Sequence, residues 1–117
     1  VIPPNSELTV VDGALQLTVP VPPRGLRLPI DVLFSSLARD QGDRSIGVVL
    51  SGMGSDGTLG LRAIKERAGL ALVQDPATAK FDGMPRSAVD ATERRRSGSS
   101  TTVPLLSSAW TLSAFEE

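Results

Sequence analysis

The first part of the chain changes from two-residue to helical periodicity. Leu8 to Val19 alternates β-branched and other residues around Asp12-Gly13. This dipeptide is typical of a two-residue hairpin turn, so the segment predicts a β-hairpin. Residues 20–29 are rich in proline and predict an extended linker. In residues 30–41 the apolar positions fall at helical spacing, which predicts an amphipathic helix of about three turns.

The second part repeats a strand and a helix. Residues 45–51 and 70–74 are short, apolar and rich in β-branched residues, which predicts two buried parallel strands. Helical spacing predicts a helix at residues 58–69, with Gly69 as its stop, and a shorter one at 84–91. The βαβα order predicts an α/β fold, part of a doubly wound parallel sheet, with the hairpin near its N-terminus.

Two loops follow the predicted parallel strands, and ligands of such sheets gather at the strands' carboxyl ends. These loops cover residues 52–57 and 75–83. Asp75 before Pro76 is typical of a turn, and Pro85 suits the first turn of a helix. We also expect Arg86 to form a structural ion pair. From Thr92 the sequence ERRRSGSSTT is polar, and residues 92–117 predict a divergent tail, disordered or frameshifted.

Composition excludes several classes of function. The 117 residues include 12 basic and 13 acidic side chains, a balance that gives no field for nucleic acid. The chain has no Cys and no His, so it lacks thiolates, the commonest metal ligand and the commonest general base. No stretch approaches the roughly 20 apolar residues of a membrane span, and no signal peptide is evident. We therefore expect a cytoplasmic protein without metal, organic cofactor, nucleic-acid partner or membrane insertion.

The glycine loop after the first parallel strand has three interpretations. Gly52, Gly54 and Gly57 match the G-x-G-x-x-G spacing of dinucleotide sites, although Asp56 would repel a phosphate there. In a structural interpretation, Ser55 or Asp56 is the N-cap of the following helix. In the third, Asp56 is the carboxylate that orients a catalytic base, and the base must come from elsewhere because this chain has no His.

A family resemblance favours the third interpretation. The segments SGMGSDGTLG (residues 51–60) and QDPATAKFDGMPRSAVDA (residues 74–91) closely resemble the catalytic domain of CheB-type protein-glutamate methylesterases. Residues 24–65 are especially similar to the version fused to a CheR-type methyltransferase, and the likeness covers about residues 2–91. It implies a partial methylesterase domain at residues 1–91.

The resemblance implies a function in chemotaxis-like phosphorelay signalling. Members of this family hydrolyse glutamate methyl esters on chemoreceptor helices, and many also deamidate glutamines there, with a Ser-His-Asp triad. The motif places the triad Asp at Asp56 and the active-site loop at Gly52, Met53 and Gly54. The Ser and His of the family precede the hairpin and are absent here, so we expect this chain alone to be inactive.

The implied partners are methyl-accepting chemoreceptors and either a missing N-terminal half or a fused methyltransferase domain. Two alternatives remain open: a Rossmann-like nucleotide-binding module that uses the Gly52–Gly57 loop, and a non-catalytic domain that docks on a receptor. Arg24 and Arg27 are expected in a solvated linker, and Arg94 to Arg96 in a solvated tail. We also expect an incomplete sheet to be weakly stable or to self-associate.

Overall fold

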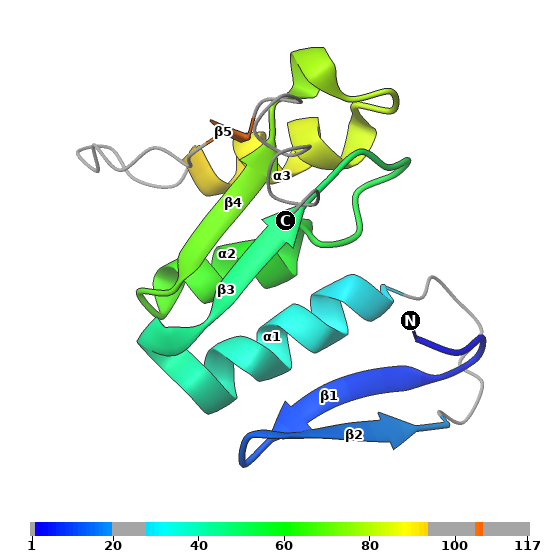
Figure 1. Ribbon diagram of the computed structural model, residues 1–117, viewed down its shortest axis with the longest axis vertical. Helices are drawn as coiled ribbons and strands as arrows, with labels where there is room; N and C mark the ends of the chain where they lie inside the picture. Colours follow the sequence, from blue (N-terminus) through cyan, green and yellow to red (C-terminus); the bar gives the residue numbers. More distant parts are fainter. Residues whose placement is uncertain (1, 20–27, 94–104, 107–117) are drawn as a thin grey trace, which may run out of the picture.

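The computed structural model describes residues 2–19, 28–93 and 105–106. It begins with a hairpin of β1 (Glu7–Val11) and β2 (Ala14–Thr18), paired antiparallel as predicted. Asp12 and Gly13 both have positive φ, 50° and 74°, as the favoured two-residue turn requires. The helix α1 (Pro29–Gln41) lies between this hairpin and the rest of the domain (Figure 1).

The second sheet is parallel, which confirms the predicted fold class. It contains β3 (Ile46–Val49), β4 (Leu70–Gln74) and the two-residue β5 (Leu105–Leu106), in that order. β3 pairs with β4 from Ile46↔Leu70 to Val49↔Val73. The connecting helices are α2 (Thr58–Glu66) and α3 (Gly83–Glu93), with one-turn helices η1 (Gly42–Arg44) and η2 (Pro76–Thr78) in the connections.

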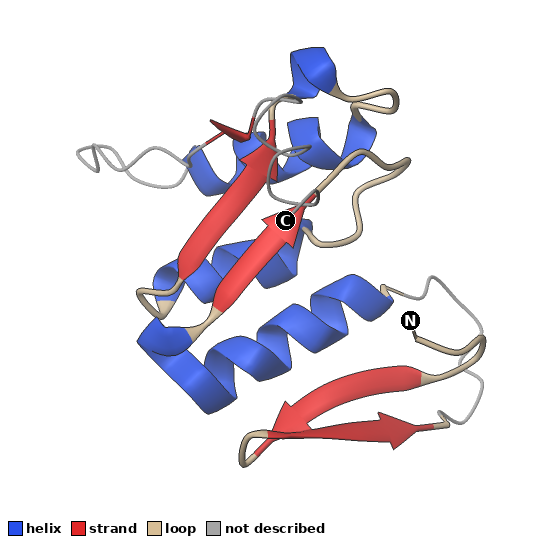
Figure 2. Ribbon diagram, viewed as in Figure 1, coloured by secondary structure: helices blue, strands red, loops and turns tan. Residues whose placement is uncertain are grey.

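The core lies on one face of this sheet. Figure 2 shows α2 and α3 behind β3 and β4. Apolar side chains of the sheet and of both helices meet there: Val49, Leu61, Ala71, Val73 and Ala88. Phe34 of α1 packs against this cluster. Gly47 allows α2 to pack closely against β3, because a Cβ at this position would lie 2.6 Å from Ile64 Cδ1 and 2.9 Å from Leu61 Cδ1.

The two strands predicted as buried are covered on only one face by the described residues. Burial alternates along β3, where Ile46 is 59% and Val48 40% exposed, and Leu70 of β4 is 45% exposed. The described helices that contact β3 and β4 lie on the opposite face, so a continuous apolar run did not mean burial on both sides. Self-association through this face stays a prediction.

The boundaries of two helices differ from the predictions. α2 ends at Glu66, and the left-handed residue after it is Ala68 (φ 64°), not Gly69. Gly69 is instead required for close packing, since a Cβ there would lie 2.4 Å from Ser45 Oγ. α3 continues to Glu93, beyond the predicted end at residue 91, and the Thr92 hydroxyl donates to the Ala88 carbonyl at 2.7 Å.

Candidate functional site

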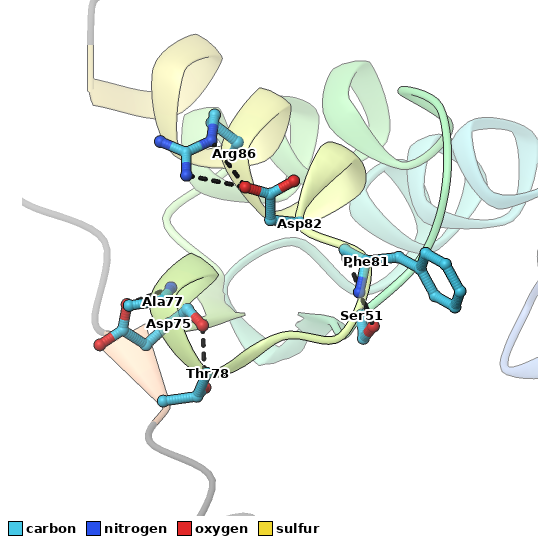
Figure 3. A network of polar contacts seen from close by, with 7 residues as sticks. All are labelled: Ser51, Asp75, Ala77, Thr78, Phe81, Asp82 and Arg86. Carbon is cyan, nitrogen blue, oxygen red and sulfur yellow. Dashed lines mark hydrogen bonds and ion pairs between the residues drawn. The ribbon is translucent and has the colours of Figure 1, made fainter.

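The candidate site lies at the carboxyl ends of β3 and β4, where backbone and side-chain hydrogen bonds join the two predicted loops. The Gly52 N–H donates to the Phe81 carbonyl, and the Met84 N–H donates to the Gly52 carbonyl, both at 3.0 Å. Ser51 Oγ accepts from the Phe81 N–H at 2.9 Å, a contact shown in Figure 3. The two loops therefore form one surface, and Ser51 has a structural partner.

Gln74 links the two loops at the end of β4, and sequence reasoning missed it. Its Oε1 accepts from the Ser51 N–H at 2.8 Å, and its Nε2 donates to the Thr78 carbonyl at 3.3 Å. The available signal was a polar residue at the carboxyl end of an otherwise apolar strand, where parallel sheets place functional groups.

The second loop confirms two structural expectations. Asp75 Oδ1 accepts from the Ala77 N–H at 3.0 Å and begins a one-turn helix, as its place before a proline predicted. Arg86 forms an ion pair with Asp82 at 2.8 Å (Figure 3). The hydrogen bond from the Arg86 guanidinium lowers the pKa of Asp82 and raises that of Arg86. Arg24, Arg27 and Arg94 to Arg96 lie outside the described residues.

The predicted loop residues lie in the first loop, as the sequence placed them. Gly52 packs against α3, because a Cβ there would lie 2.5 Å from Met84 Sδ. Gly54 has a φ of 85°, in the left-handed region that favours glycine. The Met53 side chain is 77% exposed and therefore available to a partner or a substrate. Across the joined loops, Phe81 is 47% exposed, with Lys80 Nζ 5.6 Å from the centre of its ring.

Asp56 is a helix cap, but for a different helix from the one its sequence position suggests. Its Oδ2 accepts from the Ile30 N–H at 3.0 Å, and its Oδ1 from the Asp31 N–H at 2.9 Å. Both donors lie in the first turn of α1, where helical N–H groups have no partner within the helix. The N-cap of α2 is Gly57, without a side-chain cap, so the prediction that Ser55 or Asp56 caps that helix is wrong.

The start of α2 already has a carboxylate, from a residue that the sequence did not single out. Asp31 Oδ1 accepts from the Gly60 N–H at 2.7 Å, and Asp31 is buried at 8% exposure. A negative charge at this helix start opposes the binding of a second anion. This contact weighs against the nucleotide-binding alternative for the Gly52–Gly57 loop, although the carboxylate is not the one expected.

The arrangement of Asp56 leaves room for a further hydrogen bond. A carboxylate can accept about four hydrogen bonds, and two of the Asp56 sites are used by α1. The backbone donors fix the carboxylate in place, as an acceptor for a catalytic base requires. Among the described residues, no group of three or more acidic side chains could hold a metal ion. No described helix has the length and apolar character needed to cross a membrane.

The fold and the site thus define the class of protein: a parallel α/β domain with polar loops at the carboxyl ends of its strands. The family model for CheB methylesterase matches residues 1–103, and the chain belongs to that family. This match extends past residue 91, where the sequence changes character. The division at that point and the origin of the tail stay predictions.

Two relatives show how much of the sequence is shared. An uncharacterised 104.1 kDa protein of Rhodobacter capsulatus is 50% identical over 88 residues, which are 75% of this chain and 9% of that protein. A protein-glutamate methylesterase/protein-glutamine glutaminase of Moorella thermoacetica is 56% identical over 62 residues, 53% of this chain and 15% of that enzyme. This chain therefore spans only a small part of either relative.

The fold is that of a solved catalytic domain. The crystal structure of the Thermotoga maritima CheB methylesterase catalytic domain superposes with a TM-score of 0.69 and 22% sequence identity. The superposition covers 95% of this chain and 55% of that domain.

Proposed function

We propose that this chain supplies the acidic residue of a protein-glutamate methylesterase whose Ser and His come from another polypeptide segment. The family match supports the reaction class. The observation that carries the proposal is the Asp56 carboxylate, fixed by two backbone N–H groups and still able to accept a third donor. The absence of His from the sequence requires an external base.

In the proposed reaction, the external Ser attacks the glutamyl methyl ester while the external His takes the Ser proton. Asp56 would accept an N–H of that imidazole, hold its tautomer and stabilise the imidazolium cation. The His then passes the proton to the departing methoxide, which leaves as methanol, and water hydrolyses the acyl-enzyme to release glutamate and regenerate the Ser. The proposed substrates are methylated helices of chemoreceptors, in the cytoplasm. Met53, with Gly52 and Gly54 shaping its loop, would border this site.

A chimaera tests this role, because the Moorella enzyme is 56% identical to this chain over the matched residues. The corresponding segment of that enzyme is replaced by the segment of this chain, and methanol release from a methylated chemoreceptor is measured. Asp56→Asn is the decisive variant, since Asn is also a good helix cap and keeps one carbonyl acceptor. We expect kcat to fall by about 10⁴-fold, because an amide can hold the imidazole in the wrong tautomer.

Asp75→Asn is the matched control. Asp75 is also an acidic residue at the carboxyl end of the sheet, but its carboxylate accepts a local turn N–H. We expect its kcat to stay close to that of the unmodified chimaera. An Asp56→Asn chimaera that is folded and as active as the Asp75→Asn control would refute the proposed role of Asp56.

A further inference from the structure

The starts of α1 and α2 hold each other through an exchange of carboxylates. Asp56, just before α2, accepts the Ile30 and Asp31 N–H groups of α1. Asp31, in the first turn of α1, accepts the Gly60 N–H of α2 at 2.7 Å. In Figure 1 the loop after β3 returns toward the first turn of α1. Three hydrogen bonds between segments 25 to 29 residues apart in sequence therefore form one closed ring.

Close backbone packing keeps this ring tight. A Cβ on Gly60 would lie 2.5 Å from Phe34 Cβ and 3.0 Å from Asp31 Cα, so only glycine fits at this contact. A Cβ on Gly57 would lie 3.2 Å from Ile30 Cγ2, and Gly57 has a φ of 94°. The backbone that follows Asp56, from Gly57 to Gly60, is thus held by contacts with α1.

We infer that Asp31 is a positioning residue that fixes the catalytic carboxylate of Asp56, an inference that rests on the proposed function. Asp31 takes part in the ring twice, because its N–H holds Asp56 and its carboxylate holds the first turn of α2. Loss of the Asp31 carboxylate frees α2 at Gly60, four residues after Asp56. The Asp56 side chain then loses the fixed geometry that a triad requires.

Burial makes the Asp31 contact hard to replace. At 8% exposure the carboxylate is largely withdrawn from water, and its negative charge is offset by the partial positive charge of the start of α2. Its removal leaves the buried Gly60 N–H without this acceptor, and the surrounding close packing leaves little space for water.

The test uses the same chimaera with Asp31→Ala and Asp31→Asn. We expect Asp31→Ala to lower kcat by about 100-fold with little change in KM, since a misplacement of about 1 Å costs that much. Asp31→Asn should recover most of the rate, because its carbonyl oxygen can still accept the Gly60 N–H. The double variant Asp31→Ala/Asp56→Asn should be no slower than Asp56→Asn alone, because both changes remove the same function.

Asp40→Ala is the matched control, because Asp40 lies on the same helix and also accepts two backbone N–H groups from another segment. Its kcat should match that of the unmodified chimaera. An unchanged kcat in folded Asp31→Ala, or an equal loss in Asp40→Ala, would overturn the inference. If Asp31→Ala does not fold, Asp31→Glu decides, since it keeps the charge but displaces the carboxylate; an unchanged kcat there would overturn the inference as well.

A readout without catalysis separates this inference from the proposed function. Hydrogen exchange of the Ile30 amide, measured by NMR in the chimaera, reports the hydrogen bond to Asp56. We expect exchange to be faster in Asp31→Ala and unchanged in Asp40→Ala. If Asp56→Asn remains fully active, the proposed function fails, and Ile30 exchange still shows whether Asp31 holds Asp56. Unchanged Ile30 exchange in Asp31→Ala would refute the positioning role itself.

Discussion

The two ends of α1 use the same chemistry in different surroundings. At its start, the Asp56 carboxylate accepts two N–H groups of the helix, from Ile30 and Asp31. Near its end, the Asp40 carboxylate accepts two N–H groups of the hairpin turn, from Asp12 at 2.7 Å and Gly13 at 2.9 Å. The first contact joins α1 to the domain that carries the candidate site, and the second joins it to the hairpin.

The two ends differ in their exposure to solvent and in whether their hydrogen bonds are linked to others. The contacts of Asp56 are partly buried and belong to a ring that includes Asp31, whereas the N–H groups held by Asp40 are exposed. Water can replace an exposed acceptor at little cost, while a buried donor that loses its partner keeps the full desolvation penalty. Similar hydrogen bonds should therefore contribute unequally to the stability of this protein.

The largest effect should come from removal of the carboxylates themselves. Asp56→Ala leaves two N–H groups of a helix start without their partner and should lower the free energy of unfolding by about 2–3 kcal/mol. Asp40→Ala should cost clearly less, because water reaches the turn. Urea unfolding of both variants measures the difference. Ser55→Ala, a neighbour whose side chain is exposed, is the control and should be nearly neutral. Equal losses in the two Asp variants would break the comparison.

A smaller loss of stability should follow when a side chain is placed between the starts of α1 and α2. Ala normally favours a helix over Gly by about 1 kcal/mol. Gly60→Ala should nevertheless lower the free energy of unfolding by about 1–3 kcal/mol, because its Cβ would overlap with Phe34 and approach the Asp31 backbone. Thermal unfolding followed by circular dichroism measures the change. A stabilised Gly60→Ala variant would show that the contact between α1 and α2 is looser than described.

A still smaller change in stability is expected at the end of α2, where backbone hydrogen bonds alone cap the helix. The Gly69 N–H donates to the Ile64 carbonyl at 2.9 Å, and the Ala68 N–H to Lys65 at 3.1 Å, the pattern of a Schellman motif. Ala68 holds the left-handed position, with a φ of 64°. Ala68→Gly should therefore raise the free energy of unfolding by about 0.5–1 kcal/mol, measurable in urea. A destabilised variant would contradict the strain argument.

The smallest effect should be a dependence on pH at the hairpin end of α1. The hydrogen bond from the Gln41 amide, with those of the Gly13 and Asp12 backbone, lowers the pKa of Asp40. A lowered pKa in the folded state adds stability above the unfolded value of about 3.9, and this is lost as the pH falls through the folded pKa. Asp40→Asn should therefore be less stable than wild type at neutral pH, and the gap should narrow below about pH 4. Thermal unfolding across this range measures the gap; a constant gap would exclude the linkage.

The sequence predicted those features that depend on near neighbours in the chain. Local periodicity and turn chemistry predicted the Asp12-Gly13 turn, the helix at residues 30–41, which the structure begins one residue earlier, the strand at 70–74 and the Asp75 turn. The loop motif around Asp56 gave the family in the same way, because its residues are contiguous.

Tertiary structure alone decided which backbone N–H groups the carboxylates of Asp56 and Asp31 accept. Sequence position suggested that Asp56 caps its own helix and did not single out Asp31, yet each carboxylate accepts an N–H of the other's helix, across 25 to 29 residues. Sequence spacing also could not show which face of β3 is exposed. The physical reason is that a carboxylate binds whichever unpaired N–H groups the packing of the helices brings within about 3 Å. No local pattern encodes that distance.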